Sequence, residues 1–126
     1  MRWIVDGMNV IGSRPDGWWR DRKAAMKRLS ESLAAFAAET GEPLTVVFDG
    51  GPFDLSAPPA EIEFASARGR NAADHDIARM VQQDAEPQSI TVVTSDRDLA
   101  ERVKAAGASV LGASQFRRRL DETSAR

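Results

Sequence analysis

Residues 2–11, RWIVDGMNVI, decide the fold of this 126-residue chain. The tripeptide WIV at positions 3–5 has no polar residue between its apolar side chains, which is typical of a strand buried on both faces of a parallel sheet. Asp6 follows this run at once, and Gly7 and Asn9 come after it. The segment therefore predicts a buried strand that carries a carboxylate at its carboxyl end.

The remainder of the chain alternates between strand and helix patterns. Apolar runs predict further strands at 44–48, 61–65, 89–94 and 109–111, and apolar residues at helical spacing predict helices at about 18–38, 72–84, 95–106 and 113–122. Composition predicts loops at 12–17 and 50–60. Because there is no internal repeat and no linker, we expect one domain over residues 1–126. Its expected fold has three α/β/α layers and a mostly parallel central sheet.

The composition excludes several classes of protein. Hydrophobic residues make up 42% and charged residues 29%, close to the average for a globular protein. No apolar run approaches the roughly 18 residues of a membrane span, and no signal peptide is evident, so we expect a cytoplasmic protein without membrane contact. The lack of cysteine excludes disulfides and zinc–thiolate sites. The net charge of −2 does not by itself indicate a nucleic-acid-binding protein, and we expect a monomer or weak homo-oligomer.

Acidic residues follow three of the predicted strands. Asp6 and Asp49 come directly after apolar runs, and Asp96 follows the run that ends at Thr94. In open parallel sheets the ligand site lies beyond the carboxyl ends of the strands, so three separate segments are expected to bring carboxylates to one edge of the sheet.

Helical geometry adds a fourth acid to this edge. Asp74 shares a helical face with Ile77 and Val81, at i+3 and i+7, so it begins the stripe that faces the sheet. Asp76 is turned about 200° away from Asp74 and is expected to face solvent. Asp96 shares a face with Leu99 in the same way, so it too is expected to point inward.

The start of the helix near residue 96 allows a second reading of its acids. Ser95 and Asp98 have the spacing of a capping-box variant, which would make Asp96 the first helical residue. In that arrangement the cap accounts for Asp98, and Asp96 stays available for another role. Asp6 and Asp49, each followed by glycine, are also compatible with simple turns.

Clustered carboxylates indicate a bound cation. Like charges in a partly desolvated place raise one another's pKa values and oppose folding. A hard cation offsets this cost, and Mg²⁺ or Mn²⁺ takes oxygen ligands from one or two carboxylates and from substrate phosphate. Such a metal can activate water for attack at phosphorus. The predicted cofactor is therefore Mg²⁺ or Mn²⁺, and such a metal could assist an in-line displacement at phosphorus.

Four segments, IVDGMNVI, VVFDG, NAADHDIARMV and VVTSDRDL, resemble in order and spacing the YacP-like branch of the NYN domains among the PIN-like nucleases. The resemblance covers residues 2 to about 112. It implies a PIN-like Rossmannoid fold, metal-dependent endoribonuclease activity, RNA as the partner and, as in YacP-type relatives, an association with translation and the ribosome. Carried over by position, it implies Asp6, Asp74 and Asp96 as catalytic metal ligands, Asp49 and Asp98 as further metal-binding acids, and Asn9 in support.

Basic and aromatic residues near this edge are candidates for binding RNA. The candidate phosphate-binding residues are Arg14, Arg20, Arg68, Arg70 and Arg97. Trp18 and Trp19 lie beside several arginines and either stack on bases or form a hydrophobic staple on the helix that follows. His75 is expected to be a solvated surface residue, and residues 117–119, all arginine, are expected to form a solvated helical face.

Three other functions are compatible with parts of this pattern. A receiver-like signalling domain would have paired acids after the first strand and a lysine after the last, but Gly7 follows Asp6 and no lysine follows Leu111. A phosphatase with an aspartyl nucleophile would have a second aspartate where Met8 stands. A non-catalytic RNA-binding or ribosome-binding module would retain the fold, although the intact set of acids argues against it.

Overall fold

Among the residues that the structure describes, the central sheet has five strands, all parallel, in the order β3-β2-β1-β4-β5. In this computed structural model, residues 1–67, 69 and 71–124 are described. The strands are β1 (Arg2–Asp6), β2 (Leu44–Phe48), β3 (Glu61–Phe64), β4 (Ile90–Val93) and β5 (Ser109–Leu111). The segment that opens the chain therefore becomes the central strand, with Val5 paired to Val46 on one side and to Val93 on the other.

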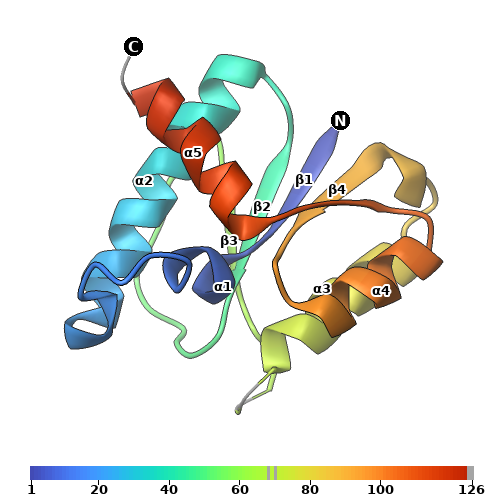
Figure 1. Cartoon of the computed structure of the whole chain (residues 1–126), viewed down its shortest axis with the longest axis horizontal. Coiled ribbons are helices and arrows are strands. Elements are labelled where there is room, and N and C mark those ends of the chain that lie inside the picture. Colours follow the sequence, from blue (N-terminus) through green and yellow to red (C-terminus); the bar gives the residue numbers. More distant parts are fainter. Residues whose placement is uncertain (68, 70, 125–126) are drawn as a thin grey trace.

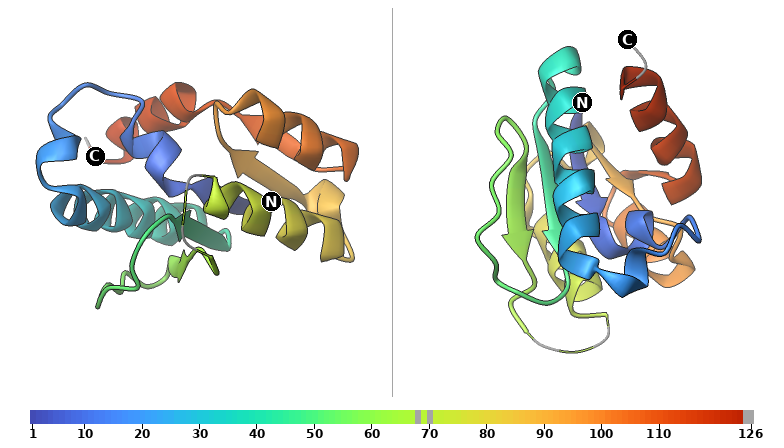
Figure 2. Two further views of the ribbon diagram at one scale, coloured as in Figure 1. Left: turned by 90° about the horizontal axis from the view of Figure 1, so that it is seen from below. Right: turned by 90° about the vertical axis from the view of Figure 1, so that its left-hand side faces the viewer.

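Helices cover both faces of the sheet, which confirms the expected three-layer fold (Figures 1 and 2). The helices are α1 (Gly7–Ile11), α2 (Arg22–Thr40), α3 (Ala72–Gln83), α4 (Arg97–Ala105) and α5 (Ala113–Ser124), with 3₁₀ turns at Trp18–Arg20 and Pro87–Ser89. Helices α1, α2 and α5 lie on one face, and α3 and α4 lie on the other. Within the described residues, no helix is long and apolar enough to cross a membrane.

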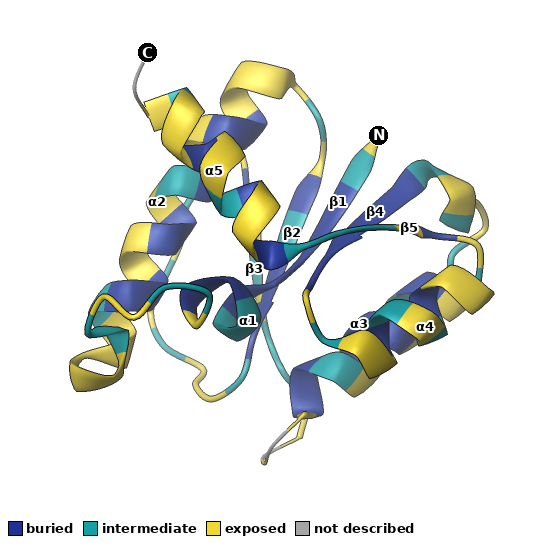
Figure 3. Cartoon of the chain, in the orientation of Figure 1, coloured by how far each residue is buried: buried dark blue, intermediate teal, exposed yellow. Residues whose placement is uncertain are grey.

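Alternate residues of β1 enter two separate cores. Trp3 and Val5 pack with the apolar side chains of α1, α2 and α5, whereas Ile4 packs with those of α3 and α4. All three side chains are buried, as is most of β2 and β4 (Figure 3). A strand that is apolar on both faces is stable only when both faces are covered, so the uninterrupted apolar run accounts for the three layers.

Two helix starts differ from those predicted. The five-residue helix α1 was not expected, because a segment this short cannot display helical periodicity. The helix predicted from residue 18 or 19 is instead a 3₁₀ turn followed by α2. Asp21 separates the two, and its side chain accepts a hydrogen bond of 3.1 Å from the backbone N–H of Ala24, which caps α2.

The prediction that residues 117–119 form a solvated face is confirmed for Arg118 and Arg119, which are exposed, and is wrong for Arg117, which is partly buried. The Arg119 guanidinium lies over the rings of Trp3 and Phe36, at 5.2 and 5.4 Å from their centroids. The Arg117 guanidinium donates hydrogen bonds of 2.9 and 3.2 Å to the carbonyls of Val10 and Ile11. These contacts join α5 to the core and to the end of α1, which helical spacing within α5 alone does not reveal.

Candidate active site

Asp6 ends the central strand and is almost fully buried, with 4% of its surface exposed. Its Oδ2 accepts a hydrogen bond of 2.9 Å from the hydroxyl of Thr94, the residue that follows β4. The Thr94 Oγ1 in turn accepts a hydrogen bond of 3.1 Å from the backbone N–H of Asp96. Thr94 therefore links two of the predicted catalytic acids, and it was not among the predicted site residues. Its only signal in the sequence is a hydroxyl at the tip of a strand next to β1.

Gly7 lets the chain turn directly from Asp6 into α1. A Cβ atom at this position would lie 2.4 Å from Cδ1 of Phe48 and 3.0 Å from a methyl group of Val46. Real Cβ atoms essentially never come as close as the first of these distances, so any larger residue would have to displace the buried ring of Phe48. The glycine after Asp6 is needed for this close approach.

Asn9 joins α1 to the loop after β4. Its Oδ1 accepts a hydrogen bond of 2.8 Å from the backbone N–H of Ser95. The Ser95 hydroxyl accepts one of 2.9 Å from the backbone N–H of Ala113, at the start of α5. Asn9 therefore supports the site by fixing the segment that carries Asp96.

Asp96 caps α4, which corrects the predicted capping box. Its Oδ1 accepts a hydrogen bond of 2.9 Å from the backbone N–H of Leu99, and the helix begins at Arg97. The Ser95 hydroxyl instead accepts the hydrogen bond from Ala113, because tertiary contacts that a local capping rule does not include hold this loop. Asp98 is exposed in the first turn of α4 and takes no part in the cap.

Asp49 connects the tip of β2 to the start of α3. The residue before α3, Asn71, has a positive φ of 67° and gives no side-chain cap. The Oδ1 of Asp49 accepts a hydrogen bond of 2.9 Å from the backbone N–H of Ala73 instead. This bond fixes the residue immediately before Asp74, so Asp49 orients the helix that carries Asp74.

The prediction that Asp76 faces solvent is wrong. Asp76 is buried and accepts hydrogen bonds of 2.6 and 2.8 Å from the backbone N–H and hydroxyl of Ser66, and one of 2.5 Å from Arg79. Burial alone would raise the pKa of this carboxyl, but the bonds from Ser66 and Arg79 outweigh it and lower the pKa. The segment after β3 covers this face of α3, and helical geometry alone cannot show such a neighbour.

The acids at the strand ends interact electrostatically. Burial raises the pKa of Asp6 to about 7, the hydrogen bond from Thr94 opposes this rise, and the charges of Asp74, Asp49 and Asp96 add to it. Burial also raises the pKa of Asp74 to about 6, together with the charges of Asp96 and Asp49 and a hydrogen bond with Asp96. Four carboxylates from four segments therefore face one region at the carboxyl ends of the strands.

These carboxylates provide the donor chemistry for a hard cation. Asp6, Asp49 and Asp96 each use one oxygen in a hydrogen bond of 2.9 Å within the fold. Within the described part of the chain, no three His, Cys, Asp or Glu side chains form a ready-made ligand cluster. The arrangement therefore fits a cation of the Mg²⁺ type, which commonly takes one or two carboxylates and completes its shell with water and phosphate oxygens. It does not fit a closed structural metal site.

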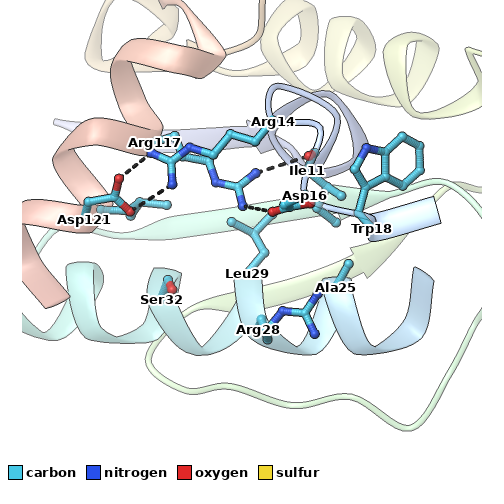
Figure 4. A pocket seen from close by; sticks show the side chains of 11 residues that line it. Ile11, Arg14, Asp16, Trp18, Ala25, Arg28, Leu29, Ser32, Arg117 and Asp121 are labelled. Atoms are coloured by element: carbon cyan, nitrogen blue, oxygen red, sulfur yellow. Dashed lines mark hydrogen bonds and ion pairs between the residues drawn. The ribbon is translucent and has the colours of Figure 1, made fainter. Parts of the chain in front are cut away.

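The predicted RNA-binding arginines have different surroundings. Arg14 forms an ion pair with Asp121 of α5 and lines a cavity of about 200 Å³ between the 12–17 loop, α2 and α5 (Figure 4). Arg20 and Arg97 are exposed. The remaining two candidates, at positions 68 and 70, lie outside the described residues. His75 is exposed, as expected, and its Nδ1 lies 3.3 Å from a guanidinium nitrogen of Arg102.

Residues 3–126 match the family model of the YacP-like NYN domain. The structure is similar to the crystal structure of Rae1 (YacP) from Bacillus subtilis, with 26% identity, a TM-score of 0.78, and coverage of 100% of this chain and 76% of that chain. A crystal structure of a single-site mutant of the same protein gives a TM-score of 0.82 at 26% identity, covering 100% of this chain and 79% of that chain. No curated protein matches the sequence.

Proposed function

The chain belongs to the family of YacP-like NYN domains, which have a nuclease fold, and on this premise we propose that it is a divalent-metal-dependent endoribonuclease. Nuclease domains of the NYN and PIN-like type generally use divalent metals. The proposed cofactor is Mg²⁺ or Mn²⁺, which fits the all-oxygen donor set. The proposed substrate is RNA, and the resemblance to YacP-type proteins extends the proposal to RNA associated with the ribosome.

The observation that carries this proposal is the convergence of Asp6, Asp74 and Asp96, with Asp49 beside them, at the carboxyl ends of the central strands. The pKa values of Asp6 and Asp74 are raised to about 7 and about 6, so their charged forms are costly without a compensating cation. Perturbed carboxylates at the ligand-binding edge of a parallel sheet are typical of functional sites.

We assign a separate task to each of these residues. Asp6, Asp74 and Asp96 would hold the metal, which when bound would supply a Lewis acid at the phosphodiester. Thr94 orients Asp6 by donating a hydrogen bond to its Oδ2, and it accepts a hydrogen bond from the backbone N–H of Asp96. Asp49 orients α3, and with it Asp74, through the bond from Ala73.

Asn9 and Asp98 have supporting places in the proposal. Asn9 fixes the loop that leads to Asp96 through its bond from the Ser95 N–H. The role of Asp98 as a further metal-binding acid stays a prediction; its side chain is exposed on the first turn of α4.

Cleavage assays with matched variants test this function. Wild type, Asp74→Asn and Glu101→Gln are incubated with single-stranded and structured RNA, with Mg²⁺, with Mn²⁺ and with chelator. Glu101 is exposed on α4, so Glu101→Gln removes the same charge away from the site. We expect metal-dependent cleavage by wild type and Glu101→Gln. The cleavage rate of Asp74→Asn should be at least 100-fold lower, which is the usual effect of removing one group that stabilises charge at a catalytic site.

Two results would refute the catalytic assignment. One is undiminished cleavage by Asp74→Asn. The other is that folded wild type cleaves neither RNA with either metal. If that protein still binds RNA, it is a non-catalytic RNA-binding module.

A further inference from the structure

A cavity of about 560 Å³ opens next to the acidic site. The first turns of α2 form one wall, with Arg22, Lys23 and Met26. The loop after β2 forms the opposite wall, with Asp49 and Phe53. Asp49 therefore belongs both to this cavity and to the acidic cluster, so a ligand in the cavity would lie beside the candidate active site. Its volume falls within the range of about 300–1,000 Å³ that is usual for ligand pockets.

The cations of this wall rest on aromatic rings. The Lys23 ammonium lies 4.5 Å from the ring centroid of Phe53, and the Arg22 guanidinium lies 5.7 Å from that of Trp18. One turn earlier, the Arg20 guanidinium lies 5.9 Å from the ring of Trp19. Each of these three cations therefore lies beside an aromatic ring.

These cations are available to an anionic ligand. Arg20, Arg22 and Lys23 are exposed, and among the described residues none of them forms an ion pair with a carboxylate. Asp21 is the one acid between Trp19 and Lys23, and its side chain accepts a hydrogen bond from the N–H of Ala24 at the start of α2. By contrast, the Arg14 guanidinium is paired with an acid of α5.

Trp19 is exposed to an unusual degree for its size. It retains 52% of its accessible surface, and its ring meets that of Trp18 edge to face at a centroid distance of 6.0 Å. The 3₁₀ turn that carries both rings is closed by a hydrogen bond of 3.0 Å from the N–H of Arg20 to the carbonyl of Gly17, which has a positive φ of 83°. The exposed ring is therefore presented on an ordered turn.

We propose that Trp19, Arg20, Arg22 and Lys23, with Phe53, form a binding platform that guides a single-stranded segment of RNA past Asp49 to the acidic site. Exposed rings stack on unpaired bases, and free cations bind the phosphates between them, which is the combination that single-strand-binding proteins use. A duplex keeps its bases stacked internally and offers no base face to Trp19. The choice of RNA rests on the proposed function, whereas the preference for a single strand rests on this surface.

Binding in chelator separates this proposal from catalysis. Anisotropy of a labelled single-stranded RNA and of a duplex of equal length is measured with wild type in EDTA over a range of salt concentrations. The variants are Trp19→Ala, Trp19→Phe and the pair Arg22→Gln with Lys23→Gln. The control pair, Arg118→Gln with Lys104→Gln, removes two exposed cations from α5 and α4, away from the platform.

The expected changes differ in kind. Trp19→Ala should weaken single-strand binding at least fivefold without changing its salt dependence, since one stacked base contributes about 1–3 kcal/mol. Trp19→Phe should retain most of the affinity. The Arg22 and Lys23 pair should make the slope of log K against log salt less steep by about 1.4, because each phosphate contact to a single strand contributes about 0.7. The control pair should change neither property of binding.

The proposal would be overturned by equal losses in the platform pair and the control pair, by equal affinity for duplex and single strand, or by wild-type affinity in Trp19→Ala. Melting curves for every variant distinguish these outcomes from unfolding. If single-strand binding is lost selectively but no metal-dependent cleavage is found, the platform stands and the nuclease assignment fails. Cleavage by the platform variants with unchanged KM would support the nuclease and refute the platform.

Discussion

Asp6→Asn should make the metal-free protein more stable at alkaline pH. Asp6 has 4% of its surface exposed, and its pKa is raised from 3.8 to about 7, with burial as the largest cause. Asparagine has nearly the same shape, and its Oδ1 can still accept the hydrogen bond from Thr94. The substitution therefore removes the buried charge while it retains the contact.

The magnitude follows from the difference in proton binding between the folded and the unfolded chain. A shift of about three pKa units corresponds to ~4 kcal/mol at about 1.4 kcal/mol per unit. The folded form of Asp6 has the higher pKa, so the destabilisation that Asp6 causes is absent below pH 3.8, grows as the pH rises, and is complete above about pH 7. At pH 8, Asp6→Asn should be more stable by about 2–4 kcal/mol, which raises Tm by roughly 10 °C for a domain of this size.

The assay is thermal and urea denaturation in EDTA at pH 4 and pH 8. Wild type and Asp6→Asn should have similar free energies of unfolding near pH 4, where the Asp6 carboxyl is largely protonated in the folded chain, and should diverge by pH 8. Glu101→Gln, which removes an exposed charge, controls for the change in net charge. If Asp6→Asn is less stable than wild type at pH 8, the carboxylate of Asp6 is a structural group and the argument from charge repulsion is refuted.

Three further perturbations test other parts of the site. Mg²⁺ or Mn²⁺ should raise the Tm of wild type, and at 100 times Kd the metal should add about 2.7 kcal/mol to the free energy of unfolding. It should stabilise Asp6→Asn much less, and an equal rise in Tm for both proteins would place the cation elsewhere. Gly7→Ala should cost about 1–3 kcal/mol in urea denaturation through overpacking, and a wild-type midpoint would contradict the close approach described above. Asp76→Ala should cost about 1–3 kcal/mol, because it leaves the polar groups of Ser66 without their partner. The pKa of Asp76 is lowered, so this cost should be present at pH 7 and diminish as the pH falls below 3.8, and a cost that does not vary with pH would refute the role of its charge.

The layers of the fold were predictable because they follow from local patterns. Largely apolar runs at 3–5, 44–48 and 89–94 predict buried strands, and the amphipathic segments between them predict helices on both sides. The order of the strands is a different matter, because it depends on which neighbours each strand contacts. The sequence does not show that β1 is central, with β2 and β4 beside it.

The errors within the site share one physical cause. Helical geometry describes only the helix itself, so it left Asp76 in solvent although Ser66 from the segment after β3 covers it. The local capping rule assigned the start of α4 to Ser95, although the chain there is held by Asn9 and the hydroxyl of Ser95 is used by α5. In each case a partner distant in sequence decided the outcome.

The sequence by itself determined that strand tips and helix starts would carry Asp6, Asp49, Asp74 and Asp96 to one edge of a parallel sheet, because strand direction and helical period are local properties of the chain. Only the tertiary structure decided how these acids are held and charged. The bond from Thr94 to Asp6 and the raised pKa values depend on burial and on distances between segments that are far apart in the sequence. The same holds for the place of Phe53 in the basic and aromatic surface, since its ring meets Lys23 only when the loop after β2 packs against the start of α2.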